Sequence, residues 1–154
     1  MSRVAVAFHS GYGHTRRVAE ALRDGAASVP GTQAALLDVS RLDEALWAEL
    51  AAADAIVFGA PTYMGGPSAP FKAFADASAT VWFSQGWKDK LAGGFTCSQN
   101  MSGDKSSTLM YFVTLAMQHG MVWIGTGMMP PRQPGHPDEL NRLGSSIGVM
   151  AQAD

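Results

Sequence analysis

The sequence predicts an α/β fold, a doubly wound, open parallel sheet of five strands with helices on both faces. Short apolar runs alternate along the chain with segments whose apolar residues recur at helical spacing, and this alternation is typical of parallel sheets. Three of the apolar runs are followed by loops rich in Gly, Ser, Thr and Asn, namely residues 10–15, 59–67 and 96–103. In the strand order 2-1-3-4-5, the strands before these loops are neighbours, so we expect the loops to meet at one edge of the sheet.

The individual elements follow from apolar runs and helix-ending residues. Nearly continuous apolar runs suit strands that are buried on both faces. Pro30-Gly31 ends the first helical segment and Gly120 the last, as expected of helix-breaking residues. Strands are predicted at residues 4–8, 34–39, 54–59, 91–97 and 121–124, and helices at residues 14–28, 43–50, 70–79 and 106–119.

The length and the tail define the domain organisation. A chain of 154 residues with 47% apolar and 16% charged residues fits one domain, residues 1–154, with one sizeable core. Residues 129–137 contain four prolines and cannot form a regular helix. The segment that follows contains Gly144 and Gly148. We therefore expect residues 128–154 to be irregular or poorly formed, and the final helix of the sheet to be poor or absent.

Composition narrows the class of partner. A net charge of −2 argues against a nucleic-acid partner, which would favour a basic surface. The single cysteine, Cys97, leaves no internal disulfide and suits a reducing, cytoplasmic setting. No apolar stretch is long enough for a membrane span or a secretory leader. No metal is predicted, because the four histidines lack the usual ligand spacing.

Residues 10–15 form the most informative stretch, because a tight polar turn there joins a strand to a helix. Backbone N–H groups and the helix dipole favour an anion at such a place. A nucleoside triphosphate loop would need a Lys-Ser/Thr pair, but Gly13 is followed by His14-Thr15. A dinucleotide loop would need a third glycine, and Arg16 stands there. We therefore predict a site for one terminal phosphate, with Arg16 and Arg17 reaching into solvent.

The pattern resembles flavodoxin-like flavin reductases, in particular the WrbA-type NAD(P)H:quinone oxidoreductases. The resemblance is carried by Ser-x-Tyr-Gly-His-Thr at residues 10–15, Gly-x-Pro-Thr-Tyr-Met-Gly at 59–65, Phe-x-Asp at 74–76 with Trp82, residues 90–103, and His-Gly-Met-Val at 119–122. Together these stretches cover most of residues 3–125. The resemblance implies that FMN is the cofactor, that NAD(P)H is the co-substrate, and that a quinone or similar flat molecule accepts two electrons.

The resemblance also implies residue roles. No catalytic side chain is expected, since the flavin carries the chemistry. Tyr12 and Trp82 would lie at the nicotinamide or substrate site. The family often has two histidines before the glycine that ends its fourth helix, and this chain has Gln118-His119 there, which places a cofactor contact at Gln118. The other implied cofactor-binding residues are Ser10, Gly11, Tyr12, Gly13, His14, Thr15, Pro61, Thr62, Tyr63, Met64, Gly65, Cys97, Ser98, Gln99, Asn100 and Gly103.

Three rival functions remain beside the quinone reductase. The first is an electron carrier of the flavodoxin type without NAD(P)H turnover, and the second is a flavin-free, non-catalytic relative. The third is an FMN or azo-dye reductase on the same fold, which the sequence does not separate from a quinone reductase. The resemblance further implies a homo-dimer or homo-tetramer, because partner subunits commonly help to wall the flavin site in this family.

Overall fold

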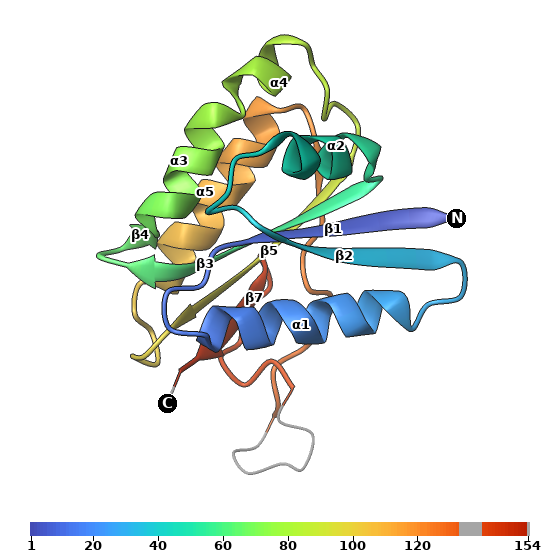
Figure 1. Cartoon of the computed structure of the whole chain (residues 1–154). Helices are drawn as coiled ribbons and strands as arrows, with labels where there is room; N and C mark the ends of the chain where they lie inside the picture. The colour runs from blue at the N-terminus through green and yellow to red at the C-terminus, as the bar shows by residue number, and fades with distance from the viewer. Residues whose placement is uncertain (133–139, 154) are drawn as a thin grey trace.

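A parallel sheet between two layers of helices forms the centre of the computed structural model, which describes residues 1–132 and 140–153 (Figure 1). The strands are β1 (Ser2–Phe8), β2 (Thr32–Asp38), β3 (Ala55–Tyr63), β4 (Gly66–Pro67), β5 (Leu91–Ser98), β6 (Val122–Trp123) and β7 (Val149–Gln152). The helices are α1 (His14–Ala27), α2 (Glu44–Ala52), α3 (Ala69–Ala77), α4 (Ala79–Phe83) and α5 (Lys105–Gln118). The strand order β2-β1-β3-β5-β6 confirms the predicted order, with two additional strands.

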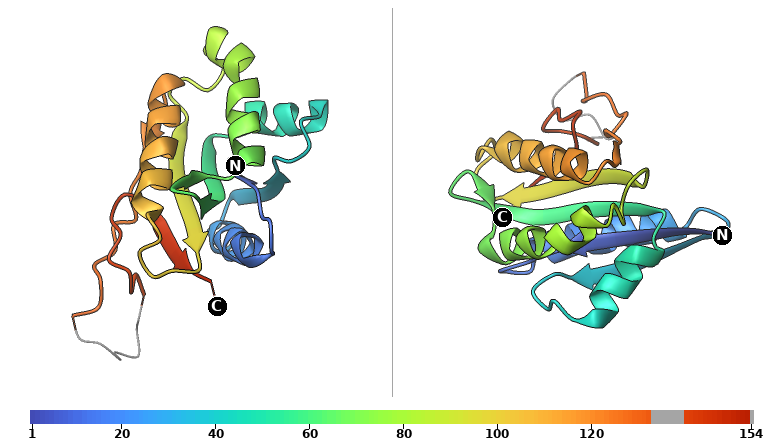
Figure 2. Two further views of the ribbon diagram at one scale, coloured as in Figure 1. Left: turned by 90° about the vertical axis from the view of Figure 1, so that its left-hand side faces the viewer. Right: turned by 90° about the horizontal axis from the view of Figure 1, so that it is seen from above.

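The helices divide the core into two parts. Helix α1 covers one face of the sheet, and α2, α3 and α5 cover the other (Figures 1 and 2). The larger part lies under the second group and is built on buried aromatic rings, among them Phe58, Phe71 and Phe112. The smaller part packs Val6 and Phe95 against α1. All of this apolar packing lies below the carboxyl ends of the strands, which leaves the loops at that edge free to form a site.

The loop predicted at residues 59–67 begins as a strand. Strand β3 continues through Pro61, which pairs with Cys97 of β5. It ends at Tyr63, where a tight turn leads into the short antiparallel strand β4. Met64 and Gly65 have positive φ angles of 50° and 78° in this turn, the backbone region that glycine adopts most readily. The turn therefore presents the side chain of Met64 to solvent.

The end of the chain differs from the irregular segment that was expected. Residues 149–152 form β7, which runs parallel to β5 from Phe95 to Ser98. Gly148, which the sequence suggested as a helix breaker, permits the close approach of the two strands. A Cβ atom at Gly148 would lie 2.6 Å from the carbonyl oxygen of Gly94. Part of the segment predicted as irregular, residues 133–139 and 154, lies outside the described residues.

Strands β6 and β7 together form one interrupted outer strand. Strand β6 borders the beginning of β5 and β7 borders its end. Two hydrogen bonds join the ends of the segment between these strands. Thr126 N donates to Ser146 O at 3.0 Å, and Trp123 Nε1 donates to Ile147 O at 2.8 Å. The described part of this segment extends away from the sheet (Figure 2). No helix among the described residues is long and apolar enough to cross a membrane.

Candidate functional site

A pocket of about 640 Å³ lies at the carboxyl edge of the sheet, within the size range of small-molecule and cofactor sites. The three predicted loops and the last strand build its wall. Its lining residues are Tyr12, His14, Thr15, Pro61, Thr62, Tyr63, Met64, Gly65, Cys97, Ser98, Gln99, Asn100, Gly103, Asp104 and Ala153. All of these except Asp104 and Ala153 were named from the sequence. The structure therefore brings most of the predicted residues together, and their roles stay predictions.

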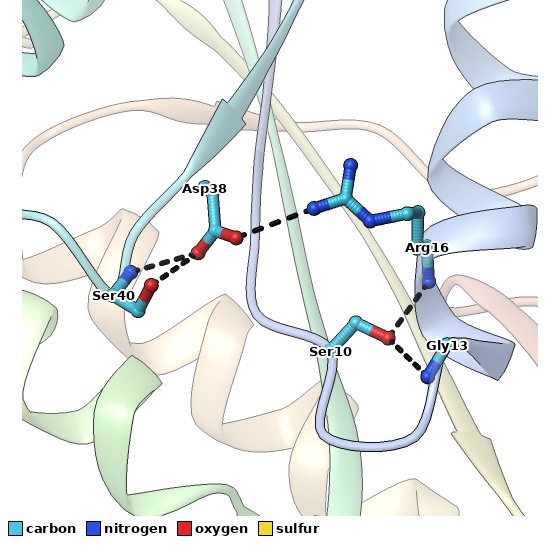
Figure 3. Close-up of polar contacts among 5 residues, drawn as sticks. All are labelled: Ser10, Gly13, Arg16, Asp38 and Ser40. Atoms are coloured by element: carbon cyan, nitrogen blue, oxygen red, sulfur yellow. Dashed lines mark hydrogen bonds and ion pairs between the residues drawn. The ribbon is translucent and has the colours of Figure 1, made fainter.

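The loop before α1 is shaped by Ser10 and two glycines (Figure 3). Ser10 Oγ accepts hydrogen bonds from the backbone N–H groups of Gly13 and Arg16, both at 3.1 Å. A Cβ atom at Gly11 would lie 2.5 Å from Tyr63 Oη, so only glycine fits there without a shift of the tyrosine. These three residues support the loop without lining the pocket.

The same loop carries backbone donors without partners. The N–H groups of Tyr12, His14 and Thr15 donate to no other described residue. They lie at the beginning of α1, where the helix dipole adds partial positive charge. Unpaired N–H groups of this kind suit a phosphate.

Arg16 is exposed, as predicted, and its guanidinium lies beside Asp38. Its Nη2 lies 3.4 Å from Asp38 Oδ2 (Figure 3). Its guanidinium lies 5.1 Å from the centre of the Phe8 ring. Burial alone would raise the pKa of Asp38, but hydrogen bonds from Ser40 and the charge of Arg16 outweigh burial and lower it. Arg16 therefore has a partner that does not depend on a bound phosphate.

The mouth of the pocket is apolar. Tyr12 and Met64 are almost fully exposed beside it, and the rings of Tyr12 and Tyr63 meet edge to face with their centres 6.4 Å apart. Burial raises the pKa of Tyr63, so its phenol is neutral near pH 7. Flat, neutral rings beside an open pocket suit a flat apolar ligand.

Three buried threonines tie the floor of the pocket together. Thr62 Oγ1 lies 2.7 Å from Thr96 Oγ1 and 2.8 Å from Thr108 Oγ1. Thr96 Oγ1 also donates to the carbonyl oxygen of Ala60 at 2.7 Å. The three side chains come from β3, β5 and α5, so this network fixes the relative positions of the elements that carry two of the loops. Only Thr62 was singled out from the sequence, because the others look like ordinary strand and helix residues.

The loop after β5 is supported from inside and from β7. Gly103 has φ +53°, and a Cβ atom there would lie 2.1 Å from Ser98 Oγ. Ala153 N donates to Ser98 O at 2.9 Å and Gln152 Nε2 donates to Gln99 O at 3.3 Å. Sequence reasoning missed this support, because the prolines before β7 led to the prediction that residues 128–154 are irregular.

Two side chains at the base of this loop influence each other. Cys97 is buried, and burial raises the pKa of its thiol, with the charge of Lys105 opposing. Burial lowers the pKa of Lys105, with Cys97 opposing. The Cys97 thiol is therefore protonated near pH 7 and serves as a small wall residue of the pocket.

Trp82 and Gln118, which were predicted at the site, do not line the pocket of this chain. Gln118 ends α5, whose 14 residues span about 20 Å from the loop after β5. Trp82 lies on α4, next to the segment that leads into the beginning of β5. Both therefore lie toward the opposite edge of the sheet. Among the described residues, no group of three or more His, Cys, Asp or Glu could hold a metal ion.

Comparison with known proteins agrees with this geometry. Residues 4–132 match the family model described as NADPH-dependent FMN reductase. Flavodoxin FldP from Pseudomonas aeruginosa is 43% identical over 157 residues, covering 99% of this chain and 82% of the relative. An NAD(P)H dehydrogenase (quinone) from Geobacter sulfurreducens is 34% identical over 143 residues, covering 79% of this chain and 70% of the relative.

A solved structure agrees as well. The flavodoxin, WrbA-like protein from Agrobacterium tumefaciens superposes with a TM-score of 0.80 at 47% identity, covering 99% of this chain and 84% of that one. The resemblance inferred from the sequence is confirmed, and FMN, the predicted cofactor, appears in the description of the matching family. The chain belongs to the NADPH-dependent FMN reductase family and has its flavodoxin-like fold.

Proposed function

We propose that this protein binds FMN in the pocket at the carboxyl edge and passes two electrons from NAD(P)H to a quinone or similar flat acceptor. The observation that carries the proposal is the pocket wall itself, in which loops with unpaired N–H groups lie beside an apolar mouth. Bound FMN would supply the hydride chemistry. The protein binds and orients the cofactor and leaves one side of it accessible.

Each part of the pocket has a proposed role. Residues 10–15 hold the phosphate through the N–H groups at the beginning of α1. Residues 61–65 lie along one edge of the flavin ring, and residues 97–103 offer N–H donors to its polar end. Tyr12 lies where a nicotinamide or a quinone approaches. Family membership and the names of the quinone-reducing relatives support these assignments.

A second copy of the chain would explain Trp82 and Gln118. Both lie away from the pocket of their own chain, so we propose that they reach the site of a neighbouring copy in a homo-dimer or homo-tetramer. The exposed side chains of Trp82 and Phe83 on α4 offer apolar surface for such a contact. We also propose a cytoplasmic setting, in which the single cysteine stays reduced.

The test uses variants of two glycines that both have a positive φ angle. Gly103→Ala places a side chain against Ser98 in the pocket wall, whereas Gly31→Ala has a comparable positive φ of +81° but nothing within 4 Å. We expect the fluorescence of FMN to be quenched when it binds to the wild type. NADPH or NADH should be oxidised when benzoquinone is added. Gly103→Ala should weaken FMN binding and Gly31→Ala should not. A wild-type protein that leaves FMN fluorescence unchanged would contradict the proposal and favour a flavin-free relative.

An electron carrier is the second candidate, and the 43% identical relative named Flavodoxin FldP favours it. A carrier would bind FMN tightly and accept electrons from dithionite, yet would not oxidise NADH or NADPH. Steady-state assays with both nucleotides and benzoquinone therefore separate the two functions.

A further inference from the structure

Lys105 is a buried cation at the base of the pocket wall. It is the first residue of α5 and is 1% exposed, which is rare for a lysine without an acidic partner. The ion pairs among the described residues are Arg16–Asp38, Arg23–Asp24 and Lys72–Asp76. None of them includes Lys105.

Backbone carbonyls take the place of the missing carboxylate. Lys105 Nζ donates to the carbonyl oxygens of Asn100 at 2.7 Å, Met101 at 2.9 Å and Ser102 at 3.4 Å. A lysine ammonium has three donors, so all three are used on consecutive residues of one loop. The loop is thereby wrapped around the charge with its carbonyl groups turned inward.

The inward carbonyls leave the N–H groups of the loop free. The residues that the structure describes contain no cis peptide bond, and in a trans peptide the N–H group points opposite to the C=O group. The N–H groups that follow the three bound carbonyls therefore point away from Lys105. From Gln99 to Asp104, no backbone N–H group donates to another described residue. Four residues of this segment line the pocket, namely Gln99, Asn100, Gly103 and Asp104, whereas Met101 and Ser102 line a neighbouring cavity.

A second lysine makes a similar contact far from the pocket. Lys90 Nζ donates to the carbonyl oxygens of Ala51, at 2.8 Å, and Ala53. It lies just before β5, at the edge of the sheet opposite the pocket. Lys90 is therefore a matched control, because it shares the chemistry of Lys105 but not its position.

We propose that Lys105 is a positioning residue of the cofactor site. It holds residues 99–104 with their N–H groups available to the acceptor atoms of FMN, and it places a positive charge behind the polar end of the flavin. The charge favours the electron-rich reduced cofactor over the neutral oxidised one. This inference rests on the proposed function, because it assumes that FMN occupies the pocket.

The experiment compares Lys105→Met with Lys105→Arg and Lys90→Met. FMN dissociation constants come from fluorescence quenching, and midpoint potentials come from equilibration with a reference dye. We expect Lys105→Met to bind FMN about tenfold more weakly and to have a lower midpoint potential. Lys105→Arg, which keeps the charge, should retain the potential. Lys90→Met should lower the melting temperature and leave the FMN dissociation constant and the midpoint potential unchanged.

Hydrogen exchange on the wild type tests the same inference without a variant. The N–H groups of residues 99–104 should exchange rapidly in the apoprotein and become protected when FMN binds. Unchanged exchange of this segment, or a Lys105→Met protein with wild-type affinity and potential, would overturn the role of Lys105 while the proposed function stands. A wild type that does not bind FMN would overturn the proposed function itself.

Discussion

His119 is a residue whose protonation the fold resists. It is 3% exposed, its Nε2 lies 2.9 Å from Ser78 Oγ, and its Nδ1 has no partner among the described residues. Its ring centre lies 4.3 Å from that of Trp87. Burial lowers the pKa of His119, because a charged imidazole would lose its hydration there. The resemblance drew attention to Gln118 beside it, but the buried residue of the pair is the histidine.

The lowered pKa predicts a loss of stability in acid. The unfolded chain binds a proton at His119 near pH 6.5, and the folded chain binds it only at lower pH. The free energy of unfolding should therefore be unaffected by this group above pH 6.5 and fall below it, by at most about 1.4 kcal/mol per pH unit. Urea unfolding from pH 7 to pH 5 measures the slope. His119→Gln should flatten it, and an equal slope in this variant would assign the effect to another group, such as His9, whose pKa burial also lowers.

The threonine network at the pocket floor gives a second prediction at this scale. Thr96→Val removes the hydroxyl that donates to the buried Ala60 carbonyl and one of the two hydroxyl partners of Thr62, which keeps only Thr108. We expect the free energy of unfolding to fall by about 1–3 kcal/mol, as measured by urea denaturation. Thr114→Val is the control, because Thr114 is exposed and bonds only to its own helix at Met110. Equal losses in the two variants would show that the network adds nothing.

At the scale of elements, the sequence predicted those strands and turns that are determined by residues close together in the chain. The apolar runs of β1, β3 and β5 and the glycine-rich turn before α1 depend on neighbouring residues, and both were placed correctly. Strand β7 could not be found in this way, since a strand of four residues is defined by its partner β5 rather than by its own pattern. Lys105 was missed for a similar reason. Its burial depends on how residues 98–104 fold around it, and a lysine in a polar loop suggests a solvent-exposed charge.

Strand β7 is expected to support cofactor binding. Gly148→Val would force a side chain against the backbone of Gly94 and against Leu109, and this should separate β7 from β5. The loop after β5 would then lose its hydrogen bonds from Gln152 and Ala153. We expect weaker FMN binding by fluorescence quenching and a lower melting temperature. Gly25→Ala, which has nothing within 4 Å, should bind FMN normally, and a Gly148→Val protein with wild-type affinity would contradict the role of β7.

At the scale of the whole molecule, the two ends of the parallel strands carry different features. The carboxyl edge holds the pocket, and the opposite edge carries Trp82 and Gln118. The exposed ring of Phe83 on α4 lies next to Trp82. If copies associate through α4, Phe83→Ser should lower the mass measured by analytical ultracentrifugation, and FMN should bind more weakly because the neighbouring copy no longer supplies Gln118. A variant with unchanged mass would place the contact between copies elsewhere.

The late position of β7 in the chain has a consequence for biosynthesis. Strand β5 leaves the ribosome about 50 residues before its outer neighbour, since Phe95 pairs with Val149. Domains form as their chain emerges, and contacts between distant residues slow folding. The loop at residues 10–15 and most of the sheet can therefore assemble on a nascent chain whose pocket still lacks the wall at Ala153. FMN should therefore bind only near the end of chain synthesis. FMN supplied during translation should be retained only by chains that extend past residue 152.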